Sequence, residues 1–106
     1  MDKSKNGKIM LGLRLKELRE AKGLLQREIA AKLEVDTAYI SKVENDEKRL
    51  SKAHISILSK LLGVTERELI NLWLADKVMS VIEKDESAEQ ALSIVQEHLK
   101  KNKSKC

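Results

Sequence analysis

The chain has 106 residues and no proline, and Leu, Ile, Ala, Lys and Glu dominate its composition. It therefore has room for one domain with an appendage, and it favours helices over a sheet. Its one cysteine, Cys106, excludes an internal disulfide framework, and no apolar run approaches the roughly 20 residues that cross a bilayer. The start MDKSKNGK lacks the apolar stretch of a signal peptide, so we expect a cytoplasmic protein with no membrane partner.

The net charge of +4 is unevenly distributed along the chain. Basic side chains outnumber acidic ones in residues 1–62, acidic side chains outnumber basic ones in residues 63–99, and the end KKNKSKC adds four lysines. This asymmetry suggests that a polyanion meets the front half and that a different partner meets the rear half.

The first elements follow from spacing. Residues 1–9 show no helical period and contain Gly, Asn and Ser, which predicts a flexible N-terminal arm. From Met10 the spacing becomes helical, with Leu11, Leu15 and Leu18 on one face, and Gly23 is a natural stop for this first helix.

Two short helices are then expected, from about residue 25 to 33 and from 37 to 45, with Asp36 as the N-cap of the second. Such helices can meet at a steep angle only where the turn is tight and the contact is small. Ala30 supplies the small contact and Val35 fills the turn. This pattern is typical of a helix-turn-helix, whose second helix is held clear of the body and fits the major groove of DNA.

Ser51 can cap a fourth helix that ends at Gly63, and Thr65 with Glu68 matches a capping box that opens a long fifth helix. Residues 84–86 look like a turn. A sixth helix follows, with an apolar stripe of Ala88, Ala91, Leu92, Val95 and Leu99. The last residues, 100–106, are predicted to form a basic flexible tail.

The segment LRLKELREAKGLLQREIAAKLEVDTAYISKVEN resembles the Xre family, which includes the phage Cro and repressor proteins. The resemblance covers residues 10–74. It implies an all-α fold: a five-helix, lambda-repressor-like helix-turn-helix domain with an extra C-terminal helix. The family usually has Gly where this chain has Glu34, and often where it has Asp46. If the backbone of Glu34 has a positive φ, Glu costs roughly 1 kcal/mol relative to Gly.

The resemblance implies that four side chains of the third helix reach base edges: Thr37, Ala38, Ser41 and Lys42. Lys42 can donate to guanine O6 or N7, and Thr37 and Ala38 can touch a thymine methyl group. Taken without the motif, the same four residues would fit an ordinary solvated helix face.

Phosphate contacts are implied for Gln26, Tyr39, Asn45, Lys48 and Arg49. Such contacts set affinity and register rather than sequence choice. For Lys48 and Arg49 the alternative is plain solvent exposure, and the ring of Tyr39 could pack under the third helix while its hydroxyl reaches a phosphate. Arg19 and Glu44 match a family ion pair that ties the first helix to the end of the third, a structural role.

Residues 75–99 exceed the family's minimal module. Their apolar stripe either folds back onto the domain's own core or forms a homodimer interface around Trp73, Leu74, Val78, Val81 and Ile82. We favour the dimer, because a monomeric module reads only a few base pairs whereas a dimer reads paired half-sites.

His54 and His98 are too isolated to predict a metal site, and no nucleophile–base pair, cofactor motif or small-molecule site is evident, so we expect no enzyme. The sequence predicts a sequence-specific transcriptional regulator, most simply a repressor, that binds double-stranded DNA as a homodimer. Resemblance to restriction–modification controller proteins suggests a subclass. The alternative is an antitoxin whose rear helices bind a partner toxin.

Overall fold

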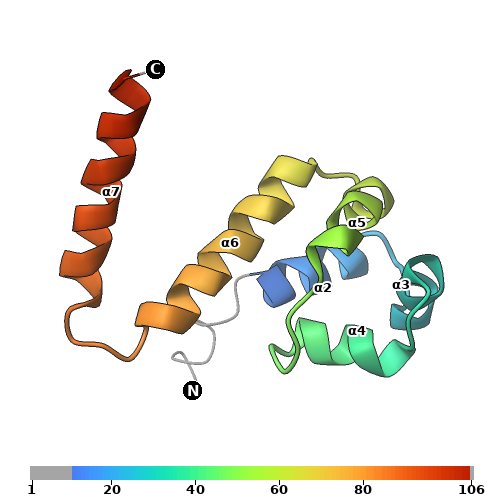
Figure 1. Cartoon of the computed structure of the whole chain (residues 1–106). Helices are drawn as coiled ribbons and strands as arrows, with labels where there is room; N and C mark the ends of the chain where they lie inside the picture. The colour runs from blue at the N-terminus through green and yellow to red at the C-terminus, as the bar shows by residue number, and fades with distance from the viewer. Residues whose placement is uncertain (1–10, 106) are drawn as a thin grey trace.

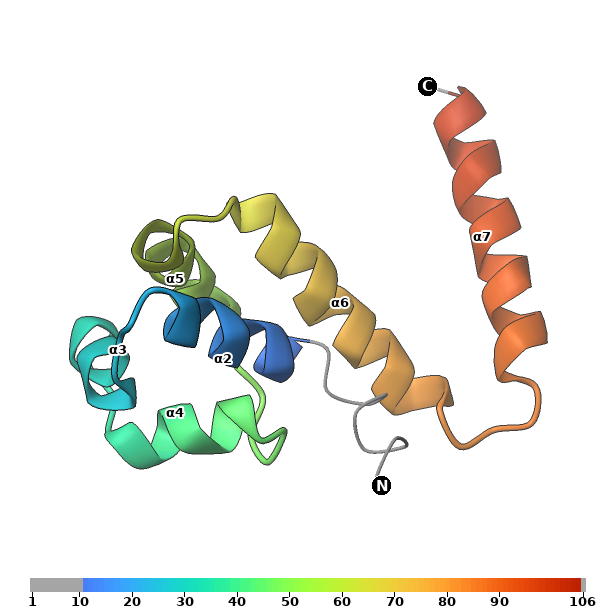
Figure 2. The ribbon, with the colours of Figure 1, turned by 180° about the vertical axis from the view of Figure 1, so that it is seen from behind.

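The computed structural model describes residues 11–105, and this part of the chain is built from helices (Figure 1). In chain order the elements are α2 (Leu11–Ala21), α3 (Gln26–Leu33), α4 (Thr37–Glu44), the short 3-10 helix η1 (Lys52–His54), α5 (Ile55–Leu62), α6 (Glu66–Ile82) and α7 (Ala88–Lys105). The predicted all-α class is confirmed for the described residues. Both views show α2 to α6 gathered into one body and α7 standing apart beyond a loop (Figures 1 and 2).

One apolar core holds α2 to α6 together. Its buried residues are Leu11, Leu15, Ile29, Ala30, Leu33, Ile40, Val43, Leu50, Ile55, Leu58, Leu62 and Leu69. Ile55 and Leu69 are the most deeply covered, with 1% and 0% of their surface exposed. Burying a side chain of this size contributes about 1.5–3 kcal/mol. Because every helix from α2 to α6 supplies buried residues, the core fixes the position of the short pair α3 and α4.

The predicted stop and cap signals act locally. Gly23 and Gly63 adopt φ values of 69° and 73°, the left-handed conformation that ends a helix. The Asp36 carboxylate accepts a hydrogen bond from the Tyr39 backbone N–H at 3.3 Å and so caps α4. Ser51 caps η1 rather than α5 directly, because η1 forms the first turn and α5 proper begins at Ile55.

The predicted capping box at the start of α6 forms only in part. The Thr65 hydroxyl oxygen accepts from the Glu68 backbone N–H at 3.1 Å. The Glu68 carboxylate does not return to the cap, because it accepts instead from the Arg14 guanidinium at 2.9 Å. The guanidinium brings a full opposite charge to the carboxylate, whereas a backbone N–H brings only a dipole, which favours the pair with Arg14. Glu68 thereby joins α6 to α2.

The end of the chain differs from the prediction. We expected the last helix to stop near Leu99 and residues 100–106 to form a flexible tail, but α7 continues to Lys105. Lysines are good helix formers and interact favourably with the negative end of the helix dipole, so they prolong the helix. The predicted arm, residues 1–9, and Cys106 lie outside the described residues.

Helix α7 does not fold back onto the core, which was one of the two alternatives for the rear helices. Among its described side chains none is buried, and Val95 and Leu99 are 50% and 58% exposed. The second half of α6 is also open, with Val81 80% exposed. Within residues 11–105, no helix combines the length and the apolar character needed to cross a membrane.

Candidate DNA interface

The turn between α3 and α4 is tight because its backbone reverses at Glu34. This residue has φ 60° and ψ 44°, the left-handed conformation that favours glycine. The N–H of Val35 donates to the Ala30 carbonyl at 3.0 Å, and the Val35 side chain packs against the core. Ala30 itself is only 3% exposed, so a larger side chain there would push α4 away from α3. The predicted tight turn and small contact are both present.

Helix α4 presents one face to the core and the other to solvent. Ile40, Val43 and Glu44 are buried. Thr37, Ala38 and Lys42 are exposed and Ser41 is half-buried, so the four predicted base-reading residues share the outward side. In Figures 1 and 2, α4 lies at the edge of the body, with α2 between it and α5. The helix is thus offered outward, and the roles of its side chains at DNA bases stay predictions.

A buried carboxylate sets the orientation of α4. Glu44 receives two hydrogen bonds from the Arg19 guanidinium, Nε to Oε2 at 2.7 Å and Nη2 to Oε1 at 3.0 Å. The Gln26 side-chain amide adds a third, Nε2 to Oε1 at 2.9 Å. The predicted ion pair between Arg19 and Glu44 therefore forms, and it joins α2, α3 and α4 through one group. The hydrogen bond with Glu44 raises the pKa of the Arg19 guanidinium against the opposing effect of burial.

The sequence did not predict that the Gln26 side chain forms a hydrogen bond within the chain. Its amide N–H₂ group is committed to Glu44, while its backbone opens the first turn of α3. The N-cap Leu25 has no side-chain acceptor of its own, and its backbone N–H donates to the Glu28 carboxylate at 2.7 Å. A helix start of this kind favours an anion. Sequence reasoning also missed Arg27, which is exposed directly beside Gln26 and offers a cation at the same place.

Tyr39 ties α4 to the loop that follows it. Its hydroxyl donates to the Arg49 carbonyl oxygen at 3.4 Å and accepts from the Ser51 backbone N–H at 3.2 Å. The half-buried ring packs against the core and makes a T-shaped contact with the His54 ring, with the two ring centroids 6.0 Å apart. The predicted phosphate contact of this hydroxyl is untested. Its observed contacts give Tyr39 a positioning role that we did not predict.

The loop of residues 45–50 carries the other predicted phosphate ligands. Asn45, Lys48 and Arg49 are all exposed, next to the end of α4. Asp46, the second departure from the family's glycine pattern, has φ 65° and so also occupies the left-handed region. The loop therefore presents two cations beside the outward face of α4, which is the arrangement that a phosphate backbone requires.

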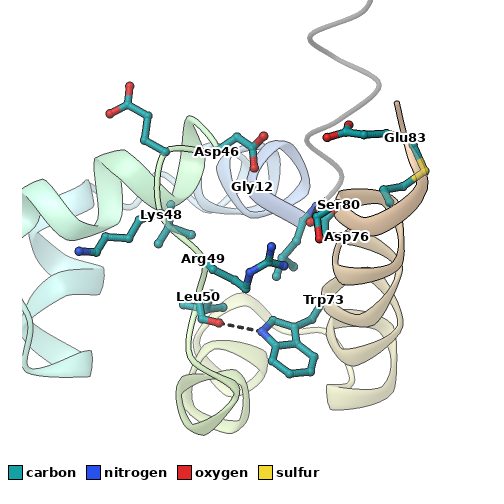
Figure 3. A pocket seen from close by; sticks show the side chains of 13 residues that line it. Gly12, Asp46, Lys48, Arg49, Leu50, Trp73, Asp76, Ser80 and Glu83 are labelled. Carbon is teal, nitrogen blue, oxygen red and sulfur yellow. Dashed lines mark hydrogen bonds between the residues drawn. The ribbon is translucent and has the colours of Figure 1, made fainter. Parts of the chain in front are cut away.

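Trp73 anchors the other end of this loop. Its indole Nε1–H donates to the Leu50 carbonyl oxygen at 2.7 Å, as Figure 3 shows. The Lys77 ammonium lies 4.4 Å from the ring centroid, in cation–π contact. The ring is half-buried against the core, and its role in a dimer interface stays a prediction. An indole N–H prefers a hydrogen-bond partner, and the loop offers one.

The other predicted interface residues remain largely uncovered. Leu74, Val78 and Val81 are 53%, 39% and 80% exposed, whereas Ile82 is half-buried. A cavity of about 340 Å³ lies between α6 and the loop, lined by charges of both signs that include Arg49 and Asp76 (Figure 3). Among the described residues, no group of three His, Cys, Asp or Glu side chains is placed to hold a metal ion.

A short helix with an outward polar face, carried by a tight turn and followed by a basic loop, defines a helix-turn-helix protein of the DNA-binding class. Residues 15–69 match the family model described as "Helix-turn-helix", and the chain belongs to this family. The predicted Xre-like resemblance is confirmed. The family is one of DNA-binding transcription regulators and not a family of enzymes.

Comparison with similar proteins indicates which kinds of helix-turn-helix protein this chain resembles. The chain is 37% identical over 65 residues to "Control protein C.MunI" of a Mycoplasma species, which covers 60% of this chain and 88% of that protein. It is 36% identical to the solved restriction-modification controller protein C.AhdI from Aeromonas hydrophila, with a TM-score of 0.54 over 60% of this chain and 97% of that one. The clp gene regulator ClgR from Corynebacterium glutamicum shares the fold, at 22% identity and a TM-score of 0.55 over 81% of this chain and 92% of its own.

Proposed function

We propose that this protein binds a specific double-stranded DNA operator as a homodimer and regulates transcription from it, most simply as a repressor, in the manner of a restriction–modification controller. The observation that carries the proposal is the outward face of α4, whose exposed Thr37, Ala38 and Lys42 stand beside a basic loop. The similarity to two controller proteins favours this function over the antitoxin alternative. A regulator acts where the chromosome is, so the proposal includes a cytoplasmic location.

In the proposed complex, α4 enters the major groove. Lys42 donates to guanine O6 or N7, Thr37 and Ala38 contact thymine methyl groups, and Ser41 bonds to either kind of base. Phosphate contacts come from Gln26 at the start of α3 and from the loop after α4, and they fix register and affinity. No cofactor and no small-molecule ligand is part of the proposal.

The exposed residues of α6 support self-association. Leu74, Val78 and Val81 present an apolar face that the described part of the chain leaves open. Two copies joined through this region would set their two α4 helices on half-sites separated by about one turn of DNA, roughly 34 Å. A symmetric dimer would then require an operator with matching two-fold symmetry.

Selection of bound fragments from random duplex DNA tests the proposal. We expect enrichment of one short sequence that occurs twice, as inverted half-sites. Enrichment without any sequence preference would contradict base reading by α4.

Substitution in α4 gives a sharper version of the same test. Lys42→Ala should change the selected sequence at one position of each half-site and cost roughly 1–3 kcal/mol there. Arg49→Ala should weaken binding to all sequences alike and reduce the dependence of affinity on salt. The matched control is Lys60→Ala, an exposed lysine on α5, which lies on the far side of the body from α4 and should change neither property. An unchanged sequence preference in Lys42→Ala would remove Lys42 from the base-reading set.

A further inference from the structure

Helix α7 is a long amphipathic helix, and none of its described side chains is buried. Its apolar stripe consists of Ala88, Ala91, Leu92, Val95 and Leu99, spaced so that all five share one side of the helix. Leu92, Val95 and Leu99 are 38%, 50% and 58% exposed. Most of the stability of a helix in a protein comes from packing of its apolar face rather than from propensity, so this stripe requires a partner. The family model ends at residue 69, before α7 begins.

The charges of α7 and of the turn before it are divided along the axis. Residues 83–89 carry four acidic side chains and one lysine, Lys84, whereas residues 97–105 carry four lysines and one acidic side chain, Glu97. A parallel copy would set like charges side by side, whereas an antiparallel copy sets acidic ends beside basic ends. The antiparallel arrangement also opposes the two helix dipoles favourably. The segment is therefore complementary to itself in one orientation only.

We propose that α7 pairs in antiparallel orientation with α7 of a second copy of this chain, apolar stripe against apolar stripe. Ala88 and Leu99 are eleven residues apart, about three turns, and therefore share one side of the helix. The stripes overlap over their whole length when Ala88 packs against the partner's Leu99 and Leu92 packs against the partner's Val95, with Ala91 opposite the partner's Gln96. This register also brings Glu89 close to the partner's Lys100, because these two residues lie on the same edge of the stripe.

A second copy is the occupant that the charge pattern selects. One segment supplies both the acidic and the basic half, which a different protein would have to match by a separate surface. An antiparallel helix pair has a two-fold axis through its middle, as a symmetric dimer requires. The inference rests on the proposed function for the existence of a homodimer, and it adds α7 to the exposed face of α6 as a pairing surface, with its orientation and register.

Sedimentation equilibrium of the full-length protein without DNA tests the surface. Val95→Glu places a charge in the middle of the stripe and should raise the dimer dissociation constant at least about tenfold. The matched control is Ile94→Glu, because Ile94 is 68% exposed and lies one residue away but off the stripe. This control should leave the dissociation constant within about twofold, since surface substitutions away from contacts change little. A monomeric parent protein, or equal effects of the two substitutions, would overturn the proposal.

Disulfide crosslinking tests the orientation independently. In a Cys106→Ser background, Ala88→Cys and Leu99→Cys are made as separate proteins and oxidised alone and as a mixture. Antiparallel pairing in the proposed register gives a crosslinked dimer only in the mixture, because only there do two cysteines come within disulfide range. Crosslinking of the Ala88→Cys protein with itself would show parallel pairing and overturn the proposal, as would the absence of crosslinks in the mixture.

The two proposals fail separately. If α7 does not pair, the DNA selection still yields a sequence that changes with Lys42→Ala. If α4 does not read bases, the selection fails while sedimentation and crosslinking still give an antiparallel dimer.

Discussion

The body formed by α2 to α6 and the isolated helix α7 use the same apolar residue types to different ends. Both helices carry apolar residues three or four positions apart. Leu69 of α6 is nevertheless fully buried, whereas Val95 of α7 is half-exposed. A periodic apolar stripe thus predicts a helix, but it does not say whether the stripe is covered by the same chain. Where the chain covers it, the stripe stabilises the fold, and where it does not, the stripe is a surface for association.

The charged side chains of the two regions also differ in burial, as the apolar side chains do. In the body, Arg19 and Glu44 form a buried, bidentate pair with fixed geometry. In α7, acidic and basic side chains lie exposed at opposite ends of the helix. Buried pairs orient the elements they join, while exposed charges act mainly on partners that approach from solvent. The body is therefore built to hold α4 still, and α7 is built to meet another surface.

Loss of the buried carboxylate should produce the largest effect. Glu44→Ala leaves the buried Arg19 guanidinium with only the exposed Glu20 carboxylate, at 4.0 Å, and removes the acceptor of Gln26. We therefore expect a loss of about 3–5 kcal/mol in the free energy of unfolding. Urea denaturation followed by circular dichroism measures it. The control is Glu97→Ala on exposed α7, which should change the free energy by less than about 0.5 kcal/mol. Similar changes in the free energy of unfolding for the two variants would contradict the stated difference between the buried charges of the body and the exposed charges of α7.

Truncation of apolar side chains compares the two regions directly. Leu69→Ala should lower the free energy of unfolding by about 2–5 kcal/mol, because it empties space in a packed core. Ile94→Ala should change it by less than about 0.5 kcal/mol, because the side chain is 68% exposed and off the stripe. Both values come from urea titration of the full-length chain. A large effect at Ile94 would mean that α7 packs on the body in solution.

The smallest expected effect is a gain. Glu34→Gly should stabilise the protein by about 1 kcal/mol, because the position has a positive φ that glycine adopts without strain. The matched control is Glu83→Gly at the end of α6, where φ is −58° and glycine should instead destabilise by a similar amount. Thermal unfolding of both variants gives the two signs. A loss in Glu34→Gly would show that the Glu34 side chain contributes more than its backbone strain costs.

Local signals explain how much of the fold could be predicted. Gly63, Asp36 and Ala30 each act within a few residues of their own position, and each has the predicted role in the structure. The end of α7 was missed because a lysine-rich tail and a lysine-rich last turn have the same composition. Since no Gly follows Leu99, there was no stop signal to separate the two.

Contacts between distant residues could not be predicted in the same way. The Asp76 carboxylate accepts from the Leu11 backbone N–H at 3.0 Å across 65 positions, and no local pattern marks that pair. The same limit applies at the candidate site. The resemblance implies phosphate contacts for Tyr39 and Gln26, but only the fold shows that the hydroxyl and the amide also form hydrogen bonds within the chain. Where a side chain has two possible hydrogen-bond partners, the packing of the fold determines which one it contacts.

The hydrogen bond between the Trp73 indole and the Leu50 carbonyl oxygen also gives the protein an intrinsic fluorescent probe. Trp73 is the one tryptophan in the sequence. Its indole N–H donates a hydrogen bond to the last residue of the loop that carries Lys48 and Arg49. Indole emission depends on hydrogen bonding and on nearby charge, and the Lys77 ammonium already lies over the ring. Intrinsic fluorescence therefore follows the state of this loop without an added dye, so titration with duplex DNA has a built-in optical signal.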